Sequence, residues 1–267
     1  MRYLSQLSLL FLALLFTACG GGEATSETTD DSTETATTPA PSMSAVGLTP
    51  MPATQEFPEA KIEGWKYSKG TFTYETSGYE FAVPTPDADA LMCANSGKGQ
   101  HAHLIIDNEP YLAKYEPTFK HDVADGEHHI LTFLSRSYHE SIKNGKAHRA
   151  IKATTTNGSF TKIAEITDPM LFYSRPKGTY VGKKATENVM LDFFPVNASL
   201  GSEYQVKAVV NGKDEFMINE WRPFYLTGLP LGENTVELTL MKGGVAVDAP
   251  LNPVTRSFKL EADPAGE

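Results

Sequence analysis

Short runs of alternating apolar and polar residues are the clearest pattern in this chain. Residues 203–210 alternate and lead into Asn211-Gly212, a dipeptide that favours two-residue β-hairpin turns. Residues 236–240 alternate in the same way, as a half-buried strand requires. No long segment has the 3.6-residue period of a helix. The pattern therefore predicts an all-β protein built from short strands.

An internal repeat extends over residues 61–267. Four blocks of sequence recur in the same order: 67–72 and 173–180, 103–108 and 207–212, 126–131 and 232–237, and 149–152 and 256–259. One duplication with small insertions explains this order. Units of about 100 residues with regularly spaced turns are typical of immunoglobulin-like β-sandwiches. We predict two tandem immunoglobulin-like β-sandwich domains, residues 61–160 and 161–267. The second is expected to begin with a short linker, in which residues 161–171 could form a short helix.

The first 18 residues have the features of a lipoprotein signal peptide. A positive start at Arg2 precedes an apolar run, residues 4–16, that is too short to span a bilayer. Residues 15–19, Leu-Phe-Thr-Ala-Cys, resemble the bacterial lipobox, which implies cleavage before Cys19 and lipidation of this residue. An ordinary signal peptide with an incidental cysteine is the alternative. We expect the mature chain to be held in the cell envelope by acyl chains on Cys19, and Gly20 after the cysteine favours the outer membrane.

Residues 19–60 form a second zone, which we expect to be a disordered tether. Residues 25–44 contain 11 Ser or Thr among 20 positions, and such a composition cannot bury enough apolar surface to fold. The whole zone has seven acidic residues and no Lys or Arg. The formal net charge is −10, and without Arg2 it becomes 22 − 33 = −11, of which the tether supplies −7. The folded part is then nearly balanced, at 22 − 26 = −4, and it has no dense Arg cluster, so we expect no nucleic-acid partner.

Three strings of residues, 92–101, 135–141 and 173–178, resemble a group of lipoproteins of Gram-negative bacteria. Genome annotation often labels these proteins "phosphopeptide-binding protein", and the resemblance covers about residues 60–264. It implies a non-catalytic module that binds a protein or peptide ligand. Phosphopeptide sites are built from Arg clusters, so Arg136, with Tyr138 in the same string, is the candidate ligand-binding pair. The alternative for Arg136 is an ordinary solvated charge.

All seven histidines lie between His101 and His148, inside the first repeat. His101 and His103 are two residues apart, so a strand would project both rings from one face and Ala102 and Leu104 from the other. Further rings could come from a neighbouring strand, through His128 or, as we predict, His129, and from the next loop, through His139. Imidazole nitrogens suit zinc and copper, so the alternative to a module that binds a protein, a peptide or another ligand is a zinc or copper site made by His101, His103, His129 and His139. The alternative is that these histidines are half-buried and hydrogen-bonded to the backbone.

No motif indicates catalysis. The string His139-Glu140-Ser-Ile-Lys143 begins like the helix of zinc proteases, but Lys143 stands where the second histidine ligand is needed. We therefore expect no enzyme activity. After loss of the signal peptide, Cys93 is the one cysteine besides Cys19, and we expect it to be buried and inert rather than paired with another chain.

Overall fold

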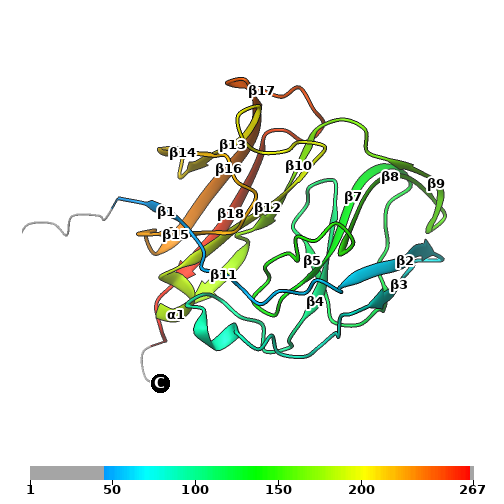
Figure 1. Ribbon diagram of the computed structural model, residues 1–267, viewed down its shortest axis with the longest axis horizontal. Helices are drawn as coiled ribbons and strands as arrows, with labels where there is room; N and C mark the ends of the chain where they lie inside the picture. Colours follow the sequence, from blue (N-terminus) through cyan, green and yellow to red (C-terminus); the bar gives the residue numbers. More distant parts are fainter. Residues whose placement is uncertain (1–44, 265–267) are drawn as a thin grey trace, which may run out of the picture. The chain divides into compact units, whose positions relative to one another are not determined.

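The computed structural model describes residues 45–264, which consist almost entirely of β-strands joined by turns (Figure 1). The first strands are β1 (Gly47–Pro50), β2 (Lys61–Ser68), β3 (Thr71–Ser77), β4 (His101–Ile106), β5 (Leu112–Lys114), β6 (Thr118–Lys120), β7 (Gly126–Ser135), β8 (His148–Thr156) and β9 (Ser159–Glu165). They are followed by β10 (Met170–Arg175), β11 (Gly178–Val181), β12 (Val189–Val196), β13 (Tyr204–Val210), β14 (Asp214–Ile218), β15 (Phe224–Thr227), β16 (Gly232–Lys242), β17 (Val245–Ala246) and β18 (Val254–Glu261). Two short helical turns, η1 (Ala88–Ala90) and α1 (Lys183–Thr186), complete the described elements.

Residues 61–165 form two sheets that face each other. One has the strand order β2-β3-β6 and the other the order β5-β4-β7-β8-β9. Apolar side chains from both sheets, including Ile62, Phe72, Leu104 and Ile130, gather in one buried cluster. Two sheets closed over a shared core make this half a β-sandwich.

The second half repeats this arrangement. Its sheets have the orders β1-β15-β12-β10 and β11-β18-β16-β13-β14, and they enclose a cluster that includes Leu191, Val206 and Leu238. The run β10-β12-β15 corresponds to β2-β3-β6, and β14-β13-β16-β18 corresponds to β5-β4-β7-β8. Three of the four recurring sequence blocks lie on these equivalent strands. In the fourth, residues 71–72 belong to β3, whereas residues 178–180 belong to β11, which pairs with β18 in the other sheet. The prediction of an all-β fold with immunoglobulin-like sandwiches is confirmed.

A third buried cluster contains residues of both halves. Ile105, Leu131 and Phe133 come from the five-stranded sheet, and Phe172 and Phe194 come from β10 and β12. These contacts join residues 45–264 into one unit, and the cluster lies on the side of β4 opposite the first sandwich core. The described residues contain no helix of the length and apolarity needed to cross a membrane.

Two predicted boundaries were wrong. Residues 47–50 were placed in the tether, yet they form β1, which pairs with β15, and Met51 beyond it is only 1% exposed. The pairing partner lies about 175 residues away in sequence, so local composition could not indicate it. Residues 161–165 were expected in a linker or a helix, but they belong to β9, because a turn at Asn157-Gly158 folds them back on β8. Cys19 and residues 19–44 lie outside the described residues.

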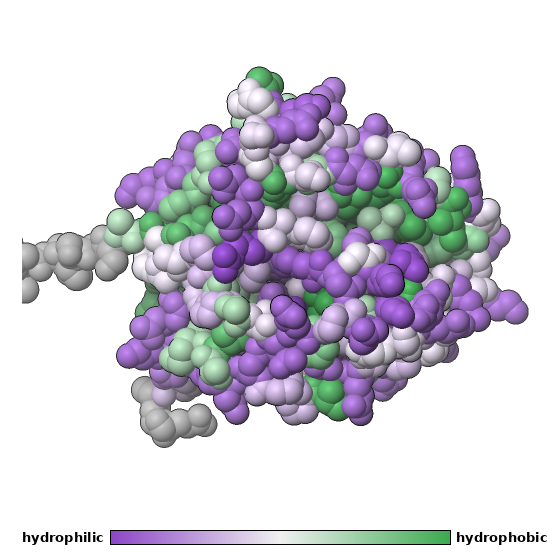
Figure 2. All heavy atoms as spheres, in the orientation of Figure 1, coloured by the Kyte–Doolittle hydropathy of each residue, from purple (hydrophilic) through white to green (hydrophobic). Residues whose placement is uncertain are grey.

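The surface mixes polar and apolar residues. On the face drawn in Figure 2, polar residues (purple) alternate with smaller apolar areas (green). The large apolar side chains that are most exposed come from separate elements: Met92, Ile163, Val181, Met217, Leu231 and Val245. Cys93, by contrast, is free and 2% exposed, and burial raises the pKa of its thiol to about 11, so the predicted burial of this cysteine is confirmed.

Candidate metal centre

Strand β4 supplies two of the candidate ligands. Ala102 and Leu104 face the core of the first sandwich, as the two-residue period predicts. His101 and His103 therefore point to the other side of the sheet, the side of Ile105 and the cluster shared by the two halves. Both histidines are completely buried, which places two polar rings in an apolar environment.

The third ring comes from the turn after β7. The backbone N–H of His139 donates to Arg136 O, and that of Arg136 donates to Glu140 O, both at 2.9 Å. His139 adopts a left-handed conformation in this turn, with φ 73°. The turn directs its ring toward β4, where His139 Nδ1 lies 2.9 Å from His101 Nε2.

Three ring nitrogens thus converge. His101 Nε2 is 2.9 Å from His103 Nε2 as well as from His139 Nδ1, and the three atoms all lie within 4.8 Å of one another. The structure therefore brings together His101, His103 and His139, three of the four residues that the sequence predicted as metal ligands.

The tautomer of His101 is set by the backbone. Its Nδ1 lies 2.8 Å from Gly99 O, a contact in which the ring nitrogen must donate. The proton on Nδ1 leaves Nε2 with a free lone pair directed at the other two rings. A histidine ligand whose second nitrogen donates to a carbonyl is the usual arrangement at metal sites, since the hydrogen bond fixes both tautomer and orientation.

Aromatic side chains enclose the three rings. The ring of Tyr111 is stacked on that of His103, with centroids 3.7 Å apart and planes 6° from parallel, and its hydroxyl lies 3.3 Å from His139 Nδ1. Tyr115 packs against His101 at 4.7 Å. Inside this enclosure His103 Nδ1 is buried without a hydrogen-bond partner.

Burial keeps the cluster uncharged. Desolvation lowers the pKa of His101 to about 4 and lowers the pKa values of His103 and His139 well below the usual value. The positive charge of Arg175 acts in the same direction on all three. Neutral imidazoles retain the lone pairs that a metal ion requires.

His129 was wrongly predicted to join this group, because the antiparallel register carries it away. His101 pairs with Ser135 and Ile106 pairs with Ile130, so His129 lies beyond the far end of β4. Six residues of strand separate His129 from Ser135, a distance of about 20 Å. There the backbone N–H of His129 donates to Asp107 Oδ1.

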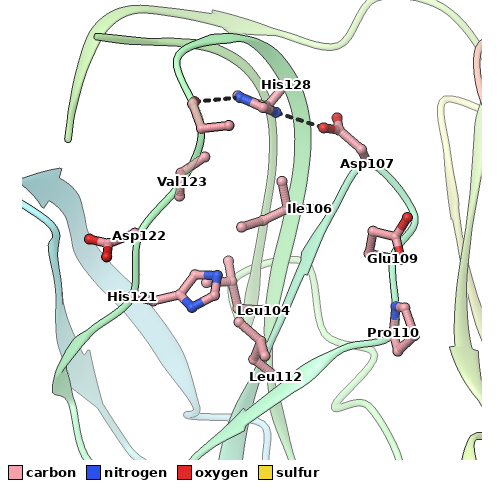
Figure 3. Close-up of a pocket in the computed structure, with 11 residues that line it drawn as sticks. Leu104, Ile106, Asp107, Glu109, Pro110, Leu112, His121, Asp122, Val123 and His128 are labelled. Carbon is pink, nitrogen blue, oxygen red and sulfur yellow. Dashed lines mark hydrogen bonds and ion pairs between the residues drawn. The ribbon is translucent and has the colours of Figure 1, made fainter. Parts of the chain in front are cut away.

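Two other histidines line a surface pocket, shown in Figure 3. The pocket has a volume of about 320 Å³ and an apolar floor that includes Leu104 and Ile106. His128 lies at its edge, with Nδ1 2.6 Å from Asp107 Oδ2 and Nε2 2.8 Å from Ala124 O. His121 lines the pocket from the loop after β6. The ring of His128 is thus held by protein atoms and the ring of His121 lines the pocket. Neither belongs to the three-histidine group.

The ligand-binding role predicted for Arg136 and Tyr138 is not supported, because both side chains are buried and occupied by the chain itself. The Arg136 guanidinium donates to Gln55 O and Ser141 O and lies 3.5 Å from Glu140 Oε1. Tyr138 is completely buried, with its hydroxyl donating to Asp87 Oδ2 at 3.2 Å. Each guanidinium nitrogen of Arg136 and the hydroxyl of Tyr138 therefore has a partner within the chain, although Arg136 also lines a surface pocket with Lys143. The burial of Arg136 contradicts the alternative of an ordinary solvated charge.

Comparisons with known proteins find a structural similarity but no matching family. A structure of the fibronectin(III)-like modules of Clostridium thermocellum CbhA aligns with 36% of this chain and all of its own chain, at 15% identity and a TM-score of 0.28. No family model matches the chain, and no curated protein matches it. A likeness at this level says nothing about what the chain binds, so the function must be inferred from the site.

Three residues around the histidines were not predicted from the sequence. Tyr111 stacks on the site, Lys177 Nζ lies 4.0 Å from the centroid of the Tyr111 ring, and Arg175 is buried close by. Arg175 and Lys177 belong to residues 173–178, one of the strings singled out in the sequence. Their proximity to the first repeat depends on the packing of the two halves, which no local pattern reveals.

Proposed function

We propose that this chain is a non-catalytic lipoprotein of the cell envelope whose folded region binds a zinc or copper ion through His101, His103 and His139. The observation that carries the proposal is the convergence of three ring nitrogens, those of the completely buried His101 and His103 and of the partly buried His139. Two of them come from one strand and the third from a turn in a strained backbone conformation. Such strain persists only where the surrounding structure holds it, and it is concentrated at functional sites.

The hydrogen bonding of the three rings also favours a cation between them. His101 Nε2 has one lone pair, yet two other ring nitrogens lie 2.9 Å from it. A lone pair of this kind accepts one good hydrogen bond, so at most one of the two contacts is well satisfied. A metal ion removes the conflict, because all three nitrogens can direct lone pairs at it.

The distances are close to those of a metal site. Nitrogens that surround zinc at about 2.0–2.1 Å with tetrahedral or trigonal angles are separated by about 3.3–3.6 Å. The two separations of 2.9 Å would need to widen by about 0.5 Å. A shift of this size is within the rotation of side chains, and His139 comes from a turn rather than from the sheet.

The location of the protein in the cell envelope is part of the same proposal. The supporting observation is the lipobox-like string that ends at Cys19, preceded by an apolar run. Mass spectrometry of the mature amino terminus would test it, with acyl groups on Cys19 as the expected result. An unmodified Cys19 would exclude the lipid anchor without affecting the metal site.

Metal analysis of variants tests the binding function. His139→Asn is the most suitable change, because Asn tolerates the left-handed conformation that residue 139 adopts. We expect the wild-type chain, purified without chelator, to retain one copper or zinc ion and His139→Asn to retain none. His128→Asn and His129→Asn are matched controls, since they remove histidines of the same repeat that lie outside the group. Equal metal content in all four proteins, or none in the wild type after metal addition, would exclude the site.

A further inference from the structure

The three-histidine group has no anionic ligand. Among the residues that the structure describes, the group of close ligand atoms consists of three imidazole nitrogens, without a carboxylate or thiolate. A further oxygen close to the group is the hydroxyl of Tyr111, 3.3 Å from His139 Nδ1, and it belongs to a phenol, which is uncharged near neutral pH. Tyr115 is no better a candidate, because its hydroxyl hydrogen-bonds with Ser96 at 2.8 Å. The site therefore offers three neutral ligands.

Zinc needs a fourth ligand in addition to such a set. Protein-bound Zn²⁺ is almost always four-coordinate, with water or a further side chain in the fourth position. Here His101 and His103 are completely buried and aromatic rings cover them, and the partly exposed His139 is the one ligand that solvent reaches. Monovalent copper, in contrast, can be held by three ligands alone. Imidazole is a suitable ligand for copper, although sulfur ligands are the ones that select Cu(I) most strongly.

Positive charge near the site also favours a monovalent ion over a divalent one. Arg175 is 5% exposed, and its guanidinium donates to Tyr180 Oη. Its Nη1 has no hydrogen-bond partner, and it makes no ion pair with any described residue. Lys177 Nζ lies over the Tyr111 ring and donates to Tyr111 O. A guanidinium keeps its charge at every accessible pH. Because the repulsion between charges scales with their product, a divalent ion is disfavoured by these groups twice as strongly as a monovalent one.

We propose that the ion bound by His101, His103 and His139 is Cu(I), held in a three-coordinate site, and that Arg175 and Lys177 select it against divalent ions. This inference rests on the metal-binding function proposed above and specifies its metal. Arg175 and Lys177 do not coordinate the ion; their positive charges determine which ion is bound.

The first experiment compares the two metals on the same protein. The mature chain is produced with Cys19→Ser, so that no amino-terminal thiol competes for copper. Cu(I) is supplied without oxygen, and its affinity is measured by competition with bicinchoninate, while Zn(II) affinity is measured with a zinc chelator. We expect one Cu(I) per chain, no displacement by a large excess of Zn(II), and an X-ray absorption spectrum of copper with three nitrogen neighbours. Displacement of Cu(I) by Zn(II), or a fourth ligand on the copper, would overturn the assignment.

The second experiment tests the role of charge. Lys177→Gln removes a charge and retains a hydrogen-bond donor, and it is the safer variant because Arg175 is wholly buried. If this variant binds Cu(I) more tightly by a factor f, it should bind Zn(II) more tightly by about f². Lys207→Gln, at the position of the second repeat that corresponds to His103, is the control and should change neither affinity. Equal gains for both metals, or no gain, would overturn the electrostatic selection.

The outcomes separate the two proposals. A chain that binds neither metal contradicts the metal-binding function itself. A chain that binds Zn(II) in preference to Cu(I), and loses it in His139→Asn, supports the function and contradicts only the inference about Cu(I).

Discussion

His101 Nε2 lies 2.9 Å from His103 Nε2, and both rings are completely buried. Side chains two residues apart in a strand share a face, so β4 alone accounts for their proximity. What the strand does not account for is the burial of two polar rings that lack good partners for all of their nitrogens, since His103 Nδ1 has none. Without a metal ion, these buried ring nitrogens therefore lower the free energy of unfolding.

Metal binding should stabilise the fold. An ion that binds only the folded state adds about 4 kcal/mol to the free energy of unfolding at a free concentration about 1,000 times the dissociation constant. We expect Cu(I), added without oxygen, to raise the melting temperature of the wild type in calorimetry. His139→Asn should melt at the same temperature with and without the ion. An equal shift in both proteins would mean that the ion binds elsewhere.

His103→Phe should separate stability from function. Phe retains the stacking on Tyr111, removes the unpartnered Nδ1 and leaves His139 as the only ring next to His101 Nε2. A buried polar atom without a partner costs about 1–3 kcal/mol, so we expect the metal-free variant to be at least as stable as the wild type and up to about 1 kcal/mol more stable. It should bind no metal. Urea unfolding gives the comparison, and a loss of more than about 2 kcal/mol would show that His103 has a structural role of its own.

Arg136 should matter for stability rather than for ligand binding. It lies 3.5 Å from Glu140, and both side chains are buried. Arg136→Ala leaves a buried carboxyl group without its partner, which typically costs about 3–5 kcal/mol. The double variant Arg136→Met with Glu140→Gln removes both charges and should recover a large part of this loss in chemical denaturation. If Arg136→Ala is as stable as the wild type, the side chain is free for another role.

The sequence predicted the strands and the duplication, because both are recorded in short-range patterns. The alternation in residues 203–210 became β13, whose side chains alternate between buried and half-buried, and Asn211-Gly212 became its turn. The pair His101 and His103 was predictable for the same reason. The prediction that His129 is a ligand failed because a strand pair can be aligned in several registers. The sequence did not determine which register β4 and β7 adopt. Arg175 could not be found at all, since it reaches the histidines only through the packing of the second half on the first.

The pair His128 and Asp107 should make stability depend on pH near neutrality. Desolvation lowers the pKa of His128, but the hydrogen bonds to Asp107 and Ala124 O and the charge of Asp107 outweigh it, so the pKa is raised above its usual value. The folded state then binds the proton more tightly than the unfolded state does. The resulting stability is complete below about pH 6.5, the pKa of an unperturbed histidine, and it is lost as the pH rises through the higher pKa of the folded state.

His128→Gln isolates this contribution from the other titratable groups at the pocket, Glu109, His121 and Asp122. The difference in free energy of unfolding between wild type and variant should be largest near pH 6 and should shrink toward pH 9, because the wild type alone loses a proton from this ring. Chemical denaturation of the metal-free proteins at several pH values gives the difference directly. His129→Gln is the matched control, since the contact of His129 with Asp107 uses its backbone N–H and survives the change. A difference for His128→Gln that grows with pH would mean that Asp107 does not hold a protonated ring, and the pair would then be an uncharged hydrogen bond.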